Sequence, residues 1–451
     1  MNSKQERHGL LITAVGLGIL LNPLNTTMIS VALARLQQYF EVSYQEISWL
    51  IASFYLASAI ANPIMGKLGD SYGRKKFFIL GLTLVTISSI AAPFSSSFGM
   101  LLVCRTIQAV GASAVNPSGM GVIRQMVGAR QARALGILAV FSSSSAALGP
   151  SIGGLLLSAG DWPALFMINF PIILASFILA MWKIPSDAKI GGQKPKIDIW
   201  GMFFFSAFVC CFLMFLLSLN GNPSWWALAG IIASFFIFYR IENRSAEPFI
   251  NLNVLIRNMG VMRVNVHYIL TNLTYYSLMF SIPMYIQSVY ELSPSESGLI
   301  MLSLALPSVL AGPVTARLIE RTGVRTTIIA GSIISLMGGI FLSISGASAS
   351  LPSIMLSLVL FGYSTGTLNV SLQQALFLQV SKRDTGVASG LFMNARFFGS
   401  MMSSSLLGFV FHDLVSPSGL HLLALFCAGS GVLMLILASR VKSAARALDG
   451  E

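Results

Sequence analysis

The sequence predicts an all-α integral membrane protein with fourteen transmembrane helices. Hydrophobic residues make up 55% and charged residues only 10% of the 451 residues. A soluble globular domain carries about 25% charged residues, so this composition excludes that class. Apolar runs of about 20 residues, the length that crosses a bilayer, follow one another along almost the whole chain. Positive charge is concentrated in the turns on one side of these runs.

The fourteen runs are joined by short turns, which leave almost no chain for a soluble domain. Gly and Pro occur inside several of them, and membrane helices tolerate both residues. The runs cover approximately 9–33, 45–65, 76–94, 98–123, 134–158, 163–183, 199–219, 224–240, 261–286, 296–316, 326–346, 351–379, 385–411 and 419–439.

The 28 Lys and Arg residues predict the orientation. If the N-terminus is cytoplasmic, all of them except Arg35, Arg105 and Arg396 fall in cytoplasmic turns or tails. The outer turns hold mainly Asp and Glu. This is the positive-inside pattern, and an even number of helices returns the C-terminus to the cytoplasm. The net charge of +12 therefore reflects topology, and we expect no nucleic-acid partner.

Two polar segments, 184–198 and 240–258, divide the runs into six, two and six. We therefore expect an N-terminal six-helix bundle over 1–183 and a C-terminal six-helix bundle with a short tail over 259–451. Residues 184–258 would hold the cytoplasmic linkers and two extra helices, the seventh and eighth. Two repeated bundles with a cavity between them are typical of transporters, whose substrate site lies near the membrane midplane.

The turn after the second helix of each half supports this repeat. It reads "GKLGDSYGRKK" over 66–76 and "ARLIERTGVR" over 316–325. The second copy places three residues where Asp70, Gly73 and Lys75 stand in the first: Glu320, Gly323 and Arg325.

Several segments in the same order resemble the major facilitator superfamily, and within it the fourteen-helix drug:proton antiporters (DHA2-type). The 66–76 turn resembles the loop between helices 2 and 3 of that family. "RTIQAVGAS" is similar to its Arg-x-x-Gln-Gly-x-Gly signature, with Ala109 in place of the first glycine. The other segments are "GPSIGGLLL" (149–157), "WPALFMINFP" (162–171), "DIWG" (198–201) and "ENRSAEPFINL" (242–252).

This resemblance implies a major facilitator fold and a secondary active transporter. It would export amphipathic drugs or toxic organic compounds by proton antiport with alternating access, which would give antibiotic resistance. We expect a monomeric, multi-pass protein of a bacterial cytoplasmic membrane, powered by the proton gradient without a cofactor. The alternative is an exporter or facilitator of one specific metabolite that need not be coupled to protons.

Two segments are candidates for gating. In the 2–3 loop, Gly66, Gly69 and Gly73 would permit a tight turn, and Asp70 can accept hydrogen bonds from Arg74. The resemblance implies that this loop latches the two halves on the cytoplasmic side. The alternative is a solvated basic turn that serves topology alone.

In helix 5, the spacing of Gly149 and Gly153 lets a neighbouring helix approach closely. Pro150 removes a backbone hydrogen bond and allows a bend. The resemblance implies that this bend shapes the cavity and limits leakage, in addition to a simple role in packing.

The first helix lacks an acid that the fourteen-helix branch typically carries. "LNPLNTTMISVAL", residues 21–33, matches its Leu-Asp-x-Thr-Ile-Val-Asn-Val-Ala-Leu-Pro signature, but Asn25 stands at the Asp position. An amide can bind a substrate or a water, yet it cannot titrate.

No Asp or Glu lies at the predicted middle of a helix to replace it. Our hypothesis is that Glu46, at the outer end of helix 2, carries the coupling proton and shares an outer vestibule with Asn25 and Arg105. Partial burial and Arg105 would tune the pKa of Glu46 in opposite directions. The alternative is a solvated carboxylate that favours the dipole of its own helix. His267 is a second titratable candidate.

Polar groups inside the helices are the candidates for substrate binding. Arg105 and Arg396 are costly to insert, by about 2.5–3.5 kcal/mol each, so they have a function or clamp helices together. With apolar and aromatic neighbours, these groups suit amphipathic neutral, zwitterionic or monocationic molecules, although many would simply bond between helices. The set is Asn25, Tyr55, Gln108, Asn272, Tyr276, Asn369, Gln373 and Arg396.

The sequence argues against other classes of function. It has no acidic metal-binding pair, Ser-His-Asp set or phosphate loop at helix ends, so we expect no enzyme and no direct use of ATP. The four cysteines fall in apolar runs without a CxxC spacing, so we expect neither a disulfide framework nor a metal site.

Overall fold

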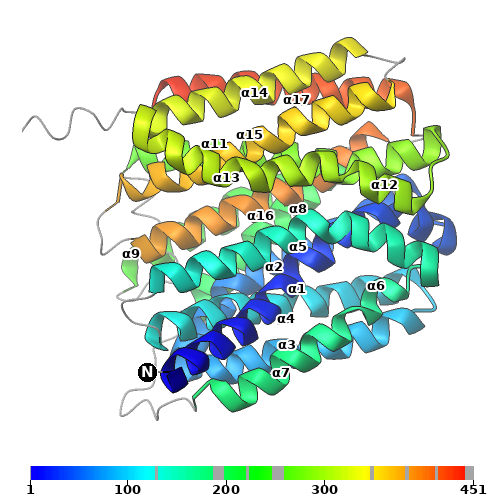
Figure 1. Cartoon of the computed structure of the whole chain (residues 1–451). Helices are drawn as coiled ribbons and strands as arrows, with labels where there is room; N and C mark the ends of the chain where they lie inside the picture. Colours follow the sequence, from blue (N-terminus) through cyan, green and yellow to red (C-terminus); the bar gives the residue numbers. More distant parts are fainter. Residues whose placement is uncertain are drawn as a thin grey trace, which may run out of the picture.

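The structure is a computed structural model that describes residues 2–126, 131–185, 198–219, 223–245, 258–345, 350–380, 385–411 and 415–441. These residues are helical and include no strand. The long helices run alongside one another (Figure 1). They are α1 (Asn2–Phe40), α2 (Tyr44–Tyr72), α3 (Arg74–Ala91), α4 (Phe98–Met126), α5 (Gln131–Gly160), α6 (Ala164–Met167), α7 (Asn169–Lys183), α8 (Ile199–Ser218), α9 (Trp225–Arg244), α11 (Met259–Val289), α12 (Pro294–Ile300), α13 (Leu302–Thr322), α14 (Val324–Ser345), α15 (Leu351–Phe377), α16 (Thr385–Val410) and α17 (Pro417–Ser439).

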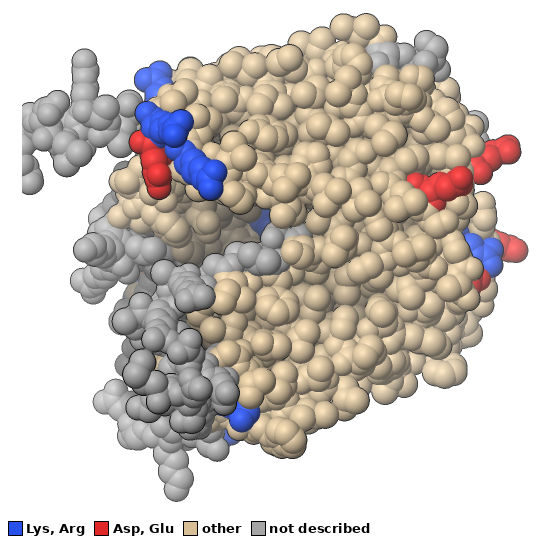
Figure 2. Space-filling model, in the orientation of Figure 1, with Lys and Arg blue, Asp and Glu red and all other residues tan. Residues whose placement is uncertain are grey.

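Each of the fourteen apolar runs predicted from the sequence contains helix. Runs 163–183 and 296–316 are each divided in two, into α6 and α7 and into α12 and α13. Among the described residues, eleven helical segments are long and apolar enough to cross a membrane. Charged side chains gather at the two ends of the visible face and leave an uncharged belt between them (Figure 2). The chain therefore has the build of a multi-pass membrane protein.

Helix α11 shows why composition alone does not single out every central helix. It is not among those eleven segments, yet it is buried over most of its length, without a break from Thr271 to Ile286. A helix enclosed by other helices need not present apolar side chains to lipid. It therefore tolerates the Asn, His, Thr and Tyr residues that line this one.

Two turns at one end of the molecule repeat the same geometry. We call this the Arg35 end, because α1 ends there and Arg35 lies in its last turns. Glu41 and Glu291 have positive φ angles of 52° and 55°. Two residues later, Ser43 and Ser293 begin α2 and α12, each with a glutamate that completes a capping box. Such boxes satisfy two otherwise unpaired backbone donors.

Two turns at the opposite end, the Lys75 end, also match. Gly73 and Gly323 are the positive-φ glycines of the described residues, with φ of 120° and 83°. Lys75 Nζ then donates to the Ile184 carbonyl just after α7, at 2.6 Å. Arg325 Nη2 likewise donates to the Ser439 carbonyl at the end of α17, at 2.9 Å. Each cation stabilises a helix C-terminus, so the correspondence seen in the sequence extends to backbone geometry and bonding.

The predicted tight turn at three glycines is wrong for two of them. Helix α2 continues to Tyr72, so Gly66 and Gly69 are helical. A Cβ at Gly69 would lie 3.0 Å from the Ser118 hydroxyl of α4. These glycines therefore bring α2 and α4 together, and Gly73 alone makes the turn.

We call α1–α7 the first group of helices and α11–α17 the last group. The two groups meet through α1 with α11, α5 with α12 and α13, and α2 with α16. Gln287 Nε2 donates to the Val31 carbonyl at 3.0 Å, and Ser151 Oγ donates to the Gly298 carbonyl at 2.9 Å. Helices α8 and α9 pair with each other, and α8 also packs on α2 and α16. The two predicted linkers are 184–198 and 240–258. Most of each, residues 186–197 and 246–257, lies outside the described residues.

Candidate functional site

An aromatic contact joins the two groups of helices at the centre of the molecule. The rings of Tyr55, on α2, and Tyr276, on α11, meet edge to face with centroids 5.4 Å apart. Phe280 lies against both rings. These side chains are buried. Two predicted substrate-binding residues, far apart in sequence, are thus in direct contact.

Arg105 lies on one side of this contact, in α4, and is 1% exposed. Its Nη1 donates to Gln108 Oε1 at 2.7 Å and to the Asn25 carbonyl at 3.3 Å. Its guanidinium carbon stands 4.4 Å from the centroid of the Phe54 ring, a cation–π arrangement. The described ion pairs involve other residues, so neutral groups surround this buried cation.

Two donors of Arg105 and its neighbour Gln108 have no partner in the described structure. They are Arg105 Nε and Gln108 Nε2, and both are buried. Buried polar atoms are nearly always hydrogen-bonded, and an unpaired donor costs about 1–3 kcal/mol. A substrate carbonyl, carboxylate or ether oxygen could accept from them. Arg105 could therefore clamp helices, as the alternative holds, or bind a substrate, a role that the sequence did not assign to it; its predicted role in proton coupling stays a prediction.

Asn25 forms a reciprocal amide pair with Asn169 of α7. Asn25 Nδ2 donates to Asn169 Oδ1 at 3.0 Å, and Asn169 Nδ2 donates to Asn25 Oδ1 at 2.9 Å. Asn169 Nδ2 also donates to Ser89 Oγ at 3.2 Å. Each amide supplies one donor and one acceptor, which a carboxylate at position 25 could not do. The residue in the acid position is therefore held as part of a neutral, matched pair.

Arg396 lies on the other side of the aromatic contact, in α16. Its Nη2 donates to the Tyr276 hydroxyl at 2.7 Å. Thus Arg105, Phe54, Tyr55, Tyr276 and Arg396 form a continuous series of contacts, which we call the central cluster. It brings together groups from α2, α4, α11 and α16 and combines aromatic faces with two cations.

The two titratable candidates make their contacts elsewhere. Glu46 is exposed, and its carboxylate accepts a hydrogen bond from the Ser43 backbone N–H at 2.8 Å. The shared vestibule with Arg105 does not appear among these contacts; the capping geometry agrees with the alternative of a helix-start carboxylate. His267 is 1% exposed, with Nε2 at 3.4 Å from Ser332 Oγ. Their roles in proton coupling stay predictions.

Of the predicted substrate residues outside the central cluster, Asn25 and Gln108 contact its Arg105, and three others make their contacts elsewhere. Asn272 Nδ2 donates to the Tyr268 carbonyl at 2.8 Å, within its own helix. Asn369 is half-buried and its Oδ1 has no described partner. Gln373, one turn further along α15, is exposed. Their contacts leave Asn369 with the clearest capacity to bind a ligand.

The candidate gating residues of the 2–3 segment bond within the first group of helices. Asp70 Oδ1 accepts from Arg74 Nε at 2.7 Å. Arg74 Nη1 donates to the Gly121 carbonyl of α4 at 2.5 Å. The predicted acceptor role of Asp70 thus has its partner, whereas the latch between halves is not among the contacts at these two residues.

The glycines of helix 5 produce a close approach to α1. Gly153 faces the Met28 carbonyl, which a Cβ would meet at 2.8 Å, and Gly149 faces Thr27. The Pro150 carbonyl lies against Gly298 of α12, in the last group of helices. These three residues therefore pack α5 on two partners at once, at a contact where the halves meet.

Asn169 and Phe54 are the central residues that the sequence reasoning missed. Asn169 was a visible signal, because it is a lone amide in the apolar stretch "WPALFMINFP". Phe54 had none, since a phenylalanine in a membrane helix is ordinary. No group of three or more His, Cys, Asp or Glu side chains in the described part of the chain could hold a metal ion.

The sequence is similar to the sequences of known transporters. The sequence profile of the Major Facilitator Superfamily matches residues 15–239 and 266–450. The uncharacterized MFS-type transporter YwoD of Bacillus subtilis is 39% identical, over 98% of both chains. The tetracenomycin C resistance and export protein of Streptomyces glaucescens is 27% identical, over 88% of this chain and 74% of its own.

One further relative and one solved structure are also similar to this chain. The riboflavin transporter RibZ of Clostridioides difficile is 24% identical, over 88% of this chain and 89% of its own. The crystal structure of a bacterial homologue of the human lysosomal transporter Spinster has a TM-score of 0.66 over 96% of both chains, at 16% identity. That likeness establishes the transporter fold.

Proposed function

Because the chain belongs to the Major Facilitator Superfamily, we propose that it is a fourteen-helix secondary active exporter of amphipathic organic compounds. It works by proton antiport with alternating access, as two six-helix bundles with two extra helices. It is a monomer in a bacterial cytoplasmic membrane, with both termini in the cytoplasm. Membership of a transporter family makes it a transporter and not an enzyme.

The central cluster is the observation that carries this proposal. Tyr55 and Tyr276 come from opposite groups of helices and touch. A substrate between these rings would contact both groups, and their separation on either side of it would expose it first to one side of the membrane and then to the other. The unpaired donors of Arg105 and Gln108 would orient it.

The chemistry of the cluster supports an amphipathic substrate. Aromatic faces bind apolar rings and tolerate a monocation, while the two arginines favour oxygen acceptors or an anionic group. Neutral, zwitterionic and monocationic compounds fit these demands better than multivalent cations, which buried arginines repel. The similarity to a tetracenomycin C export protein supports export of such compounds.

For proton coupling we keep Glu46 as the first residue to test, with His267 second. The protein contains its own control, because Glu296 closes the matching capping box before α12. Glutamine can replace glutamate in a capping box. Glu46→Gln and Glu296→Gln therefore perturb the two helix starts alike, and a coupling role would make only the first deleterious.

The test uses inverted membrane vesicles with an acid interior and a pH-sensitive dye. Ethidium, a lipophilic monocation, and a fluoroquinolone are added in turn, with vesicles lacking the protein as control. We expect each transported compound to discharge the gradient only when the protein is present. We also expect Glu46→Gln to slow the discharge at least tenfold and Glu296→Gln to leave it unchanged. Equal rates in the two variants would remove Glu46 from the mechanism.

A specific exporter or facilitator without proton coupling is the second candidate. The Asn25–Asn169 pair favours it, because a neutral pair occupies the position where coupling acids are expected. The similarity to a riboflavin transporter is compatible with a single metabolite as substrate. Movement of labelled compound without any change in the pH gradient would select this candidate.

A further inference from the structure

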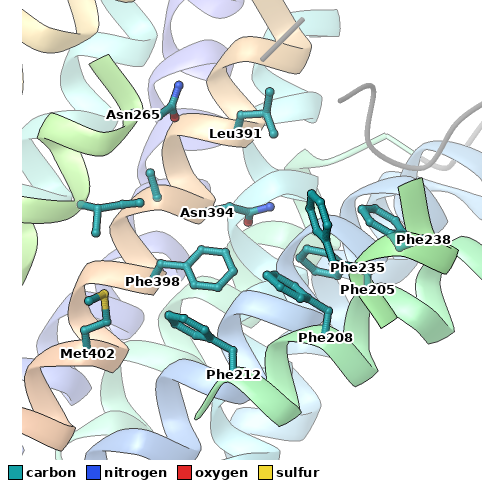
Figure 3. Close-up of a pocket in the computed structure, with 12 residues that line it drawn as sticks. Phe205, Phe208, Phe212, Phe235, Phe238, Asn265, Leu391, Asn394, Phe398 and Met402 are labelled. Atoms are coloured by element: carbon teal, nitrogen blue, oxygen red, sulfur yellow. The ribbon is translucent and has the colours of Figure 1, made fainter. Parts of the chain in front are cut away.

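A cavity of about 300 Å³ lies away from the central cluster, between α8, α9, α11 and α16 (Figure 3). Two of these helices, α8 and α9, are the extra pair that the internal repeat does not explain. They contribute five phenylalanines to its wall. The opposite wall comes from α11 and α16. The extra helices therefore form a large part of the wall of this cavity.

The aromatic wall is continuous. On α8 and α9, Phe208 and Phe235 have ring centroids 5.6 Å apart. Phe398 of α16 closes the wall, with its ring 5.6 Å from Phe212 and 6.2 Å from Phe208. Figure 3 shows these rings turned toward the same space. A wall of this kind presents ring faces and edges against which a planar aromatic molecule can pack.

Two amides supply the polar groups of the cavity, Asn265 on α11 and Asn394 on α16. Asn265 is 6% exposed, and its Nδ2 donates to the Val261 carbonyl at 2.9 Å. Its Oδ1 is buried and has no hydrogen-bond partner in the described residues. A buried acceptor without a donor points to a ligand that brings an N–H or O–H group. None of the lining side chains carries a charge.

The cavity reaches the side of the molecule at the depth of the membrane. Phe205 and Phe212 lie six and thirteen residues beyond the start of α8, or about 9 and 20 Å along the helix. Phe235, at the rim, is 43% exposed. The outer surfaces of α8 and of α9 as far as Tyr239 carry no charged side chain and would face lipid, and the exposed Arg240 and Arg244 follow at the end of α9. An amphipathic molecule dissolved in the leaflet nearer the Lys75 end would therefore meet this opening directly.

Helix α16 joins this cavity to the central cluster. Asn394, Phe398 and Met402 place one face of the helix in the cavity. Arg396, on another face, bonds Tyr276 in the central cluster. A ligand that displaces the Phe398 ring would therefore act on the same helix that holds Arg396.

We propose that this cavity is a lateral binding site for planar aromatic molecules that carry an N–H donor and enter from the membrane. The phenylalanine faces hold the ring system and accept a delocalised positive charge, and Asn265 Oδ1 accepts the N–H. The inference deepens the proposed function, because it gives exported compounds a first site before the central cluster.

The test measures equilibrium binding of ethidium, whose amino groups are N–H donors, to the purified full-length protein in lipid nanodiscs. No gradient is present, so binding is separate from transport. We expect Asn265→Leu and Phe398→Ala to weaken binding at least fivefold. Phe203→Ala is the matched control, because Phe203 lies on α8 outside the cavity and is 59% exposed. Its affinity should stay within twofold of wild type.

An ethidium analogue with dimethylated amino groups isolates the hydrogen bond. Wild type should bind it at least fivefold more weakly than ethidium, and Asn265→Leu should bind the two equally. Equal affinities for all four proteins, or no ethidium binding by wild type, would overturn the proposal. So would native mass spectrometry showing a retained phospholipid that ethidium does not displace. Ethidium binding with no transport would overturn the export function and leave the site intact.

Discussion

The two halves of this transporter are alike at their ends and different at their centres. At the ends, Gly73 and Gly323 make positive-φ turns, and Lys75 and Arg325 each bind a helix C-terminus. At the centres the polar partners differ. The first half gives its arginine a side-chain amide and a main-chain carbonyl as acceptors, and the second half pairs its arginine with a tyrosine. The repeated ends build the frame, and the unrepeated centre is free to become a binding site.

The sharpest contrast is between the two arginines. Arg105 is almost inaccessible and keeps one donor unpaired, whereas Arg396 is partly accessible and bonds a tyrosine hydroxyl. We therefore expect Arg105→Gln to lower the initial rate of ethidium transport most, by about 10- to 150-fold, since a hydrogen bond to a charged group contributes about 1.5–3 kcal/mol. Arg396→Gln should lower the rate by about threefold, because solvent partly screens this partly accessible side chain.

Thermal unfolding of both arginine variants provides the control. Removing a buried charge without an ionic partner need not destabilise a protein, so Arg105→Gln should retain the wild-type Tm. A matching loss of Tm and transport would mean that Arg105 is a structural clamp.

Asn25→Asp would place in α1 the acid that the resemblance to the fourteen-helix branch predicts at this position. An aspartate keeps the acceptor for Asn169 Nδ2 but places a second oxygen against Asn169 Oδ1, which favours its protonated form. We expect transport to acquire a dependence on one protonation, up to about tenfold per pH unit. The transport rate is measured from pH 5 to 9, with Asn22→Asp as the control on the same helix. An unchanged profile in a folded variant would show that position 25 does not couple.

The two turn glycines test whether the halves are equivalent in stability. An alanine at the φ angle of Gly73 or Gly323 is strained, at about 1–3 kcal/mol. Both variants should lower the Tm of the purified protein by similar amounts. Gly429→Ala, in a helix with nothing within 4 Å of the added Cβ, should leave it unchanged or raise it. A loss at Gly73 alone would deny the equivalence of the two turns.

The smallest effect concerns a difference between the halves at the Arg35 end. Arg35 binds Asp161 through two hydrogen bonds of 2.9 and 2.6 Å, and these bonds lower the pKa of Asp161. A lowered carboxyl pKa stabilises the folded protein above the unfolded value of about 3.9. This stability is lost as the pH falls through the folded pKa.

Because both side chains are substantially exposed, the pair contributes below about 1 kcal/mol. Wild type should exceed Asp161→Asn slightly in Tm at pH 7, and the difference should shrink as the pH falls below about 3.9 and through the lowered folded pKa of Asp161. Concentrated salt should remove most of the difference at pH 7. A difference that grows toward acid pH would contradict this assignment.

The sequence by itself determined where the helices lie, because a bilayer demands long apolar runs and a simple count finds them. It also determined the repeated turns, since Gly73, Gly323 and the cations that follow are local signals. It identified Asn25, Tyr55, Arg105, Gln108, Tyr276 and Arg396 as unusual, because polar groups are costly among apolar ones.

Only the tertiary structure decided which of those residues meet. Asn25 forms a hydrogen bond with Asn169 of α7, and the Tyr55 ring contacts the Tyr276 ring of α11. Glu46 accepts a hydrogen bond at the start of its own helix. The aromatic cavity also had no sequence signal, because phenylalanines facing lipid and phenylalanines facing one another look the same in a chain. The hydrophobic pattern specifies which residues are buried, but hydrophobic burial is non-directional. The packing of the helices against one another therefore decides which residues contact each other.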